Sequence, residues 1–206
     1  MSDTRRLIHR LHELYPNARY ELVWETPLQL LVATILAAQC TDERVNRVTA
    51  TLFQKYPDAQ AFAAADAAPL EEALKPTGFF RQKTKTVQVV CQALLDRFGG
   101  EVPACMEDLI TLPGVARKTA NVVLTTAFQI PAGIIVDTHV KRVSQRMALS
   151  RQEDPDDIEQ ELMQKVPQDE WCFFGPALVL HGRYTCVARK PDCAACPLSD
   201  GCAKKL

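Results

Sequence analysis

Four cysteines within a short C-terminal run constrain this chain more than any other feature. Cys186, Cys193, Cys196 and Cys202 form a C-x6-C-x2-C-x5-C array and make up four of the eight cysteines in 206 residues. Zinc modules usually pair two close cysteine knuckles across a longer spacer, whereas here only Cys193 and Cys196 are close. The spacing favours four thiolates around one 4Fe-4S cluster held by loops, with zinc and disulfides as the alternatives.

The composition predicts a folded protein of the reducing cytosol. A hydrophobic content of 47% is sufficient for a packed core. The first ten residues, MSDTRRLIHR, are charged, no apolar secretory segment follows them, and no stretch is long enough to span a membrane. Thiols stay reduced in the cytosol, and a thiolate cluster then forms in preference to disulfides. The other four cysteines are expected to be small buried residues: Cys40, Cys91, Cys105 and Cys172.

Basic residues gather in two places although the net charge is only −1. From residue 183 onward the sequence contains more basic than acidic residues. The five basic ones are Arg183, Arg189, Lys190, Lys204 and Lys205, and the two acidic ones are Asp192 and Asp200. A second stretch contains Arg81, Lys83 and Lys85. Each run could be an ordinary solvated helix face. Two such patches on a nearly neutral protein favour a localised site for a polyanion.

Proline and glycine divide the chain into a series of helices. Thr26-Pro27 provides a cap and a first-turn proline for a helix through Gln39, and Gly99-Gly100 ends a long helix that begins after Gly78. Further helices are expected before Pro16, from Thr41 to Pro57, within 58–74, and over 106–112, 116–128, 137–148, 154–166 and 170–182. Only Ile134–Val136 resembles a strand, and three residues do not make a sheet. The predicted fold is all-α.

Residues 112–121, LPGVARKTAN, are typical of two helices joined by a tight turn. The second helix presents unpaired backbone N–H groups and the positive end of its dipole, which together can bind a phosphate. A structural αα-hairpin would use similar residues. Lys118, in the first turn of the second helix, makes a functional site the better interpretation.

With this motif the chain resembles the bacterial endonuclease III family, the iron-sulfur, helix-hairpin-helix DNA glycosylases with lyase activity. The resemblance rests on LPGVARKTANVVL, on VDTHVKRV and on LHGRYTCVARKPDC leading into the cysteine array. It implies two helical lobes with a DNA-binding cleft between them. Residues 26–130 would form a six-helix barrel that carries the hairpin, and residues 1–25 plus 131–206 would form a domain holding one 4Fe-4S cluster.

The resemblance also implies a reaction. A base-excision glycosylase of this kind removes oxidised pyrimidines through a lysine Schiff base and then cleaves the strand by β-elimination. Lys118 matches the family's nucleophile and Asp137 its catalytic aspartate. Because only about one lysine in a few thousand is neutral at pH 7, partial burial and the helix N-terminus are expected to disfavour the ammonium form of Lys118. The structural alternatives are a solvated surface lysine and, for Asp137, a simple helix N-cap.

Catalysis requires a flipped nucleotide, so DNA contacts are expected as well. Gln39 and Phe79 match the residues that fill the vacated space, although the family usually has leucine in place of Phe79, and Phe79 could instead belong to the core. Ala116 replaces a usual glycine in the hairpin. The full set of expected DNA contacts is Gln39, Phe79, Gly114, Ala116, Arg183, Arg189 and Lys190.

Two other functions remain open. A monofunctional mismatch glycosylase of the same fold would lack the lysine at position 118. A non-catalytic iron-sulfur protein that binds DNA or carries electrons would not need the pair Lys118 and Asp137. The expected partner is damaged double-stranded DNA. The protein is expected to be a monomer in the bacterial cytosol and nucleoid, with no membrane association.

Overall fold

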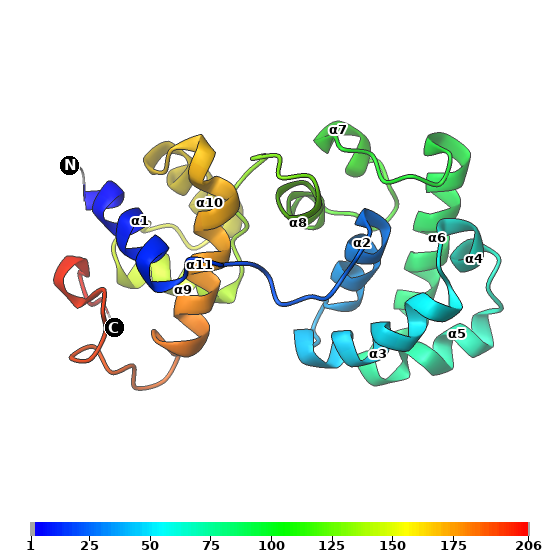
Figure 1. Cartoon of the computed structure of the whole chain (residues 1–206), viewed down its shortest axis with the longest axis horizontal. Coiled ribbons are helices and arrows are strands. Elements are labelled where there is room, and N and C mark those ends of the chain that lie inside the picture. The colour runs from blue at the N-terminus through cyan, green and yellow to red at the C-terminus, as the bar shows by residue number, and fades with distance from the viewer. Residues whose placement is uncertain (1–2, 206) are drawn as a thin grey trace. The chain divides into compact units, whose positions relative to one another are not determined.

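The computed structural model describes residues 3–205, and this part of the chain is helical throughout, with no strand. The prediction of an all-α fold is therefore confirmed. The chain separates into two compact units, which are described in turn (Figure 1). The hairpin unit is Glu21–Phe128; the cysteine unit combines the chain up to Tyr20 with the chain from Gln129 onward. The units meet between residues 20 and 21 and between residues 128 and 129. The boundaries expected from the sequence, 25/26 and 130/131, lie five and two residues later.

Helices of the hairpin unit begin where short polar side chains can cap them. Thr26 Oγ1 accepts a hydrogen bond from the Gln29 backbone N–H at 3.2 Å, and Asp58 Oδ1 accepts one from the Ala61 N–H at 2.7 Å. The elements are α2 (Pro27–Leu36), α3 (Asp42–Lys55), α4 (Ala59–Ala63), α5 (Ala67–Leu74), the short 3₁₀ turn η1 (Lys75–Thr77), α6 (Phe80–Phe98), α7 (Met106–Leu109) and α8 (Arg117–Ala127).

The core of the hairpin unit lies around its longest helix. Helix α6 packs against α4 and α5, and α2 packs against α8. The largest fully buried side chains come from most of these helices: Leu30, Leu31, Leu36, Phe62, Leu70, Leu74, Leu94, Leu109, Leu112 and Leu124. Each contributes about 1.5–3 kcal/mol relative to an exposed side chain, so the unit has a core of its own.

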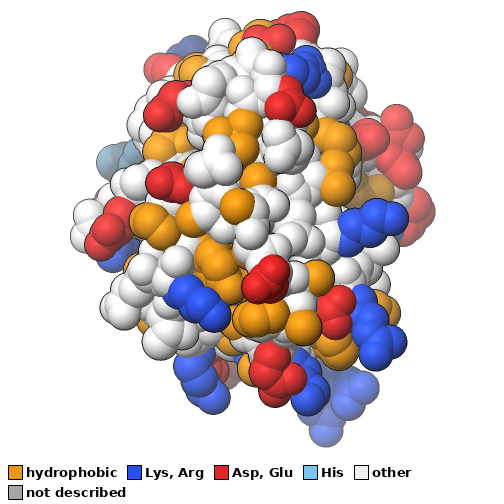
Figure 2. All heavy atoms as spheres, turned by 90° about the vertical axis from the view of Figure 1, so that its right-hand side faces the viewer, with side chains coloured by type: hydrophobic (Ala, Val, Ile, Leu, Met, Phe, Trp, Pro, Cys, Tyr) orange, Lys and Arg blue, Asp and Glu red, His pale blue; other side chains and the backbone are white. Residues whose placement is uncertain are grey.

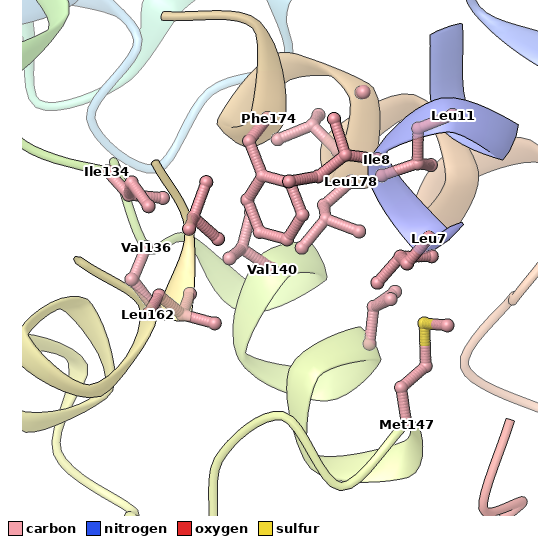
Figure 3. Packing of buried hydrophobic residues seen from close by; sticks show 14 of the residues in the cluster. Leu7, Ile8, Leu11, Ile134, Val136, Val140, Met147, Leu162, Phe174 and Leu178 are labelled. Atoms are coloured by element: carbon pink, nitrogen blue, oxygen red, sulfur yellow. The ribbon is translucent and has the colours of Figure 1, made fainter. Parts of the chain in front are cut away.

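Helix α1 joins the C-terminal helices in the cysteine unit. Its elements are α1 (Asp3–Leu14), α9 (Thr138–Arg146), α10 (Pro155–Lys165), η2 (Gln168–Glu170), α11 (Trp171–Tyr184) and η3 (Ser199–Gly201). Leu7 and Leu11 of α1 meet Phe174 and Leu178 of α11 in one buried cluster (Figure 3). Helix α11 also packs closely on α9, since a Cβ on Gly182 would lie 2.9 Å from the Cβ of His139.

Several predicted boundaries were wrong. Helix α2 ends at Leu36, not Gln39, and α7 ends at Leu109, not Leu112. Ala116 lies outside α8 with extended backbone, φ −80° and ψ 164°. Residues 134–136 are a buried extended segment without strand pairing. These differences are of a few residues at helix ends, where the sequence pattern is weakest.

The helices of residues 3–205 include no candidate for a membrane span. No helix there combines sufficient length with sufficient apolar character to cross a bilayer. Figure 2 views the molecule from the side where α4, α5 and α6 lie in Figure 1, and acidic and basic side chains both lie among hydrophobic ones on this face. This mixture agrees with a net charge of −1.

Candidate active site

The turn between α7 and α8 requires glycine at one position. Gly114 has a φ of +77°, and a Cβ there would lie 2.8 Å from the Cγ2 of Thr86 on α6. Buried Leu112 and Val115 hold the two sides of the turn, and the Val115 N–H donates to the Leu112 carbonyl at 3.1 Å. Ala116 then provides no side-chain cap for α8. The start of α8 therefore offers backbone N–H groups at an exposed turn, as the phosphate-binding prediction requires.

Lys118 lies in the first turn of α8 and its side chain is exposed. The partial burial expected from the sequence was therefore wrong. The reason is local: the buried part of α8 begins at Ala120, and Arg117 and Lys118 before it are exposed. The amine is thus accessible for attack on a substrate.

Asp137 caps helix α9. Its Oδ1 accepts hydrogen bonds from the backbone N–H groups of His139 and Val140, each at 2.8 Å. The carboxyl group is half-buried and fixed in orientation by these two bonds. The imidazole of His139 faces elsewhere, because its Nδ1 accepts a hydrogen bond from Arg142 Nη2 at 3.2 Å.

Tyr20 lies near Asp137 and belongs to no motif by which it could have been selected from the sequence. Its hydroxyl is buried and has no hydrogen-bond partner among the described residues. Burial, followed by the charges of Asp137 and Cys172, raises the pKa of Tyr20 well above its usual value. The phenol therefore stays protonated beside the carboxylate and keeps a proton to donate.

Three of the expected DNA contacts line one open cavity of the hairpin unit. Gln39, Phe79 and Gly114 surround it together with Thr119 and Lys83. Phe79 is 67% exposed, so it is not a core residue. The structure thus brings Gln39, Phe79 and Gly114, which are at least 35 residues apart in sequence, to one surface.

Lys83 does not belong to a basic surface patch as the sequence indicated. It is only 5% exposed, and its Nζ donates to the carbonyl groups of Leu36 at 2.8 Å and Thr77 at 2.7 Å. Its neighbours Arg81 and Lys85 on α6 are exposed. The predicted patch therefore loses its central charge, because that charge binds backbone carbonyls inside the unit.

The four cysteines of the array line one cavity in the cysteine unit: Cys186, Cys193, Cys196 and Cys202. All four are half-buried free thiols, which excludes the disulfide alternative in this structure. Burial and then the neighbouring cysteines raise the pKa of the Cys196 thiol. Among residues 3–205 no three candidate ligands lie close enough to share a single metal ion. Four thiols spaced around a cavity suit a polynuclear iron-sulfur group, which uses cysteine thiolates.

Polar groups surround these sulfurs. Arg146 Nη1 lies 3.5 Å from Cys186 Sγ, and the Lys204 N–H donates to Cys202 Sγ at 3.3 Å. His181 Nε2 lies 3.9 Å from Cys196 Sγ, and burial lowers the pKa of His181 to about 4, so its ring is neutral at pH 7. Donors of this kind stabilise thiolate ligands. His181 and Arg146 were not selected from the sequence: His181 lies within the LHGRYTCVARKPDC motif without a role assigned to it, and Arg146 lies 40 positions before Cys186.

The remaining basic residues flank the array. Arg189 and Lys190 are exposed on the loop between Cys186 and Cys193, while Arg183 is half-buried near the end of α11. Exposed cations on a loop can contact phosphates without a rigid pocket. Phosphate contacts by Arg183, Arg189 and Lys190 stay a prediction.

Two family models match this chain. Residues 32–168 match the HhH-GPD superfamily base excision DNA repair protein, and residues 186–202 match the iron-sulfur binding domain of endonuclease III. The second match begins at the first cysteine of the array and ends at the last.

Relatives and solved structures agree with these matches. The endonuclease III of Synechocystis sp. is 56% identical over 93% of this chain and 88% of its own length. A non-covalent endonuclease III–DNA complex superposes with a TM-score of 0.92 at 40% identity, covering 99% of this chain and 96% of that one. A trapped endonuclease III–DNA covalent intermediate also gives 0.92, at 39% identity, covering 99% and 97%.

Proposed function

Because the chain belongs to the endonuclease III family, it is a bifunctional base-excision DNA glycosylase and AP lyase, and we propose that Lys118 and Asp137 carry its chemistry. The observation that carries this assignment is the position of Lys118. The exposed amine in the first turn of α8 follows directly after a glycine turn at a helix start with no side-chain cap, which supports phosphate binding there. A bound DNA backbone would therefore bring a sugar close to that amine.

The reaction proceeds through a covalent bond between this lysine and the sugar. The neutral amine of Lys118 attacks C1′ of the deoxyribose, a C–N bond forms, and the damaged base leaves with the electrons of the glycosidic bond. The sugar ring opens to an iminium, which draws electrons from the C2′–H bond as that proton is removed. The C3′–O bond then breaks and the 3′ phosphate leaves, so the strand is cut.

Asp137 stabilises the positive charge that develops on the sugar and assists proton transfer. Its cap bonds to His139 and Val140 hold the carboxylate in one orientation before substrate arrives. Such preorganisation supports a catalytic role, because a fixed charge needs no rearrangement during the reaction. The protonated hydroxyl of Tyr20 is a second fixed dipole near this carboxylate.

Recognition of DNA is divided between backbone and bases. The Gly114 turn with Ala116 binds a phosphate through backbone N–H groups, and Arg183, Arg189 and Lys190 contact phosphates near the cysteine array. Gln39 and Phe79 fill the space left by the flipped nucleotide. The exposed ring of Phe79 supports this role, since an aromatic wedge stacks on neighbouring bases.

The array carries the iron-sulfur site of the family. Cys186, Cys193, Cys196 and Cys202 would hold one 4Fe-4S cluster, and the donors around them fit an anionic sulfur-ligated group. When bound, the cluster supplies a rigid centre that shapes the basic loop carrying Arg189 and Lys190.

The expected substrates are oxidised pyrimidines in duplex DNA, bound by a monomer in the bacterial cytosol. A thermostable thymine-DNA glycosylase shares the fold at a TM-score of 0.88 but only 20% identity, so that likeness concerns the fold alone. Lys118 itself favours the lyase over a monofunctional mismatch enzyme, since base removal by water needs no amine at this position.

Borohydride trapping tests the proposal. The protein is incubated with duplexes that carry thymine glycol, an abasic site or an A·G mismatch, and the reductant is added during the reaction. Wild-type protein should give a covalent adduct with the first two, and Lys118→Gln should give none while binding DNA normally. Lys55→Gln, which changes another exposed lysine of the hairpin unit, serves as the control. An adduct that persists in Lys118→Gln would place the nucleophile elsewhere.

A further inference from the structure

Lys83 joins two segments of the hairpin unit by its buried ammonium group. Its Nζ donates to the carbonyl of Leu36, the last residue of α2, and to the carbonyl of Thr77, the last residue of η1. Carbonyls at helix ends lack intrahelical partners, and a buried ammonium is tolerated only when it is hydrogen-bonded. The two groups therefore satisfy each other, and the contact fixes the distance between two chain segments.

Each segment is followed within three residues by a residue with left-handed backbone. Gln39 follows Leu36 by three residues and has a φ of +54°; Phe79 follows Thr77 by two and has a φ of +48°. Left-handed backbone is disfavoured for any residue with a Cβ, and it persists only where surrounding contacts impose it. Lys83 provides such a contact at the start of each segment.

The side chains of Gln39 and Phe79 line the same cavity as Lys83. Both are exposed, so packing against the core does not determine where they lie. Their position depends on the backbone from which they project, and this backbone is held at Leu36 and Thr77.

We propose that Lys83 is a positioning residue that holds Gln39 and Phe79 together at the rim of one cavity, ready to enter a duplex. The inference rests on the proposed function, in which these two side chains replace a flipped nucleotide. Lys83 itself does not contact DNA, since it is 5% exposed and both of its described hydrogen bonds are to backbone carbonyls. Burial lowers the pKa of Lys83, partly opposed by Cys40, in agreement with an interior location.

Two substrates separate this role from general damage to the fold. One is a duplex with a single abasic site; the other is the same strand without its complement, which leaves no vacancy to fill. Strand cleavage is measured on both for wild type, Lys83→Met and Lys83→Arg. Methionine keeps the length of the side chain but removes the donors. The control is Lys75→Met, which removes an exposed lysine of η1 that pairs only with Glu72 in the described contacts.

In Lys83→Met the ratio of the duplex rate to the single-strand rate should fall about ten- to hundredfold, as expected when a group is misplaced by about an ångström. The ratio should be unchanged in Lys75→Met. Lys83→Arg keeps a cation but cannot place one nitrogen between the two carbonyls, so a smaller fall is expected; this variant gives the test if the methionine variant does not fold.

An unchanged ratio in a folded variant, or an equal loss on both substrates, would overturn the proposal. A different result would contradict the proposed function: borohydride would trap a covalent adduct between Lys118→Gln and the single strand.

Discussion

Asp137 Oδ1 lies 2.8 Å from the backbone nitrogen of Val140 and accepts its hydrogen bond. The same oxygen accepts a second bond from the His139 N–H. One carboxylate oxygen thus begins helix α9, and the same group carries the charge proposed for catalysis. Structural and catalytic roles coexist in this residue, and substitutions can separate them.

Asp137→Asn should keep the fold and lose most of the base-release rate. Asparagine caps a helix about as well as aspartate, whereas removal of the charge removes the electrostatic stabilisation of the reaction. Asp137→Ala should lose activity to a similar degree and also about 1 kcal/mol of unfolding free energy. Single-turnover base release and urea denaturation measure the two effects. Full activity in Asp137→Asn would reduce Asp137 to a helix cap.

Gly114→Ala should weaken DNA binding strongly. The new Cβ would lie 2.8 Å from Thr86 Cγ2, and the residue would also need a φ of +77°. We expect a loss of about 1–3 kcal/mol in unfolding free energy and a turn that no longer fits a phosphate. Gly99→Ala is the matched control, because it imposes a φ of +62° with no atom within 4 Å. It should lose some stability and keep DNA affinity. Equal affinities in both variants would contradict the assigned phosphate site.

The purified protein should be brown and contain about four irons per chain, as one cube requires. Changing any array cysteine to serine should remove the colour: Cys186, Cys193, Cys196 or Cys202. Cys105→Ser, which changes a half-buried thiol of the hairpin unit, should leave it intact. Metal analysis and the visible absorption spectrum are the measurements. Stoichiometric zinc with ample iron supplied would contradict the iron-sulfur assignment.

Replacing both Arg189 and Lys190 by alanine should weaken binding to all duplexes alike. Phosphate contacts carry no sequence information, and each one lost should reduce the slope of log affinity against log salt by about 0.9. The slope of the double variant should therefore fall by about two. Binding is measured from low to moderate salt with intact and damaged duplexes. A loss limited to damaged DNA would instead place these residues at the lesion.

The stability of the protein should fall in alkali because of Cys91. Burial raises the pKa of this thiol from 9.0 to about 12. The unfolded thiol loses its proton from about pH 9 upward while the folded thiol keeps its own. The unfolding free energy therefore falls between pH 9 and 12, by up to about 4 kcal/mol for three pKa units. Urea denaturation at pH 8 and pH 10.5 should show a steeper fall for wild type than for Cys91→Ala. Parallel curves would exclude this thiol as the cause.

Helix starts were predictable because the signals for them are local. Thr26, Asp58 and Asp154 each accept a hydrogen bond from a backbone N–H two or three residues later, and such caps can be recognised in the sequence. The hairpin glycine was predictable for the same reason. Helix ends were less predictable. Helix α2 ends at Leu36 rather than Gln39, and the Leu36 carbonyl accepts a hydrogen bond from Lys83, which lies 47 positions away in the sequence.

Side-chain environments were the least predictable part. Lys83 was assigned to a basic surface because lysine is normally solvated, yet two carbonyls hold it inside the unit. Lys118 was expected to be partly buried because its chemistry calls for a neutral amine, and it is exposed. Tyr20 has no motif at all. For Lys83 and Tyr20, part of the surroundings comes from residues distant in sequence, such as Leu36 and Asp137, and periodicity carries no information about them.

The cysteine unit has its helices at opposite ends of the chain, and this order has a consequence for synthesis on the ribosome. The hairpin unit is one continuous segment and is complete once residue 128 has emerged. Helix α1 packs on α11, so it lacks this partner until residue 184 has emerged. Until then Leu7, Ile8 and Leu11 lack the apolar side chains of α11 that cover them in the folded unit. The four array cysteines follow α11 in the chain, so all four can hold a cluster only after residue 202 has emerged.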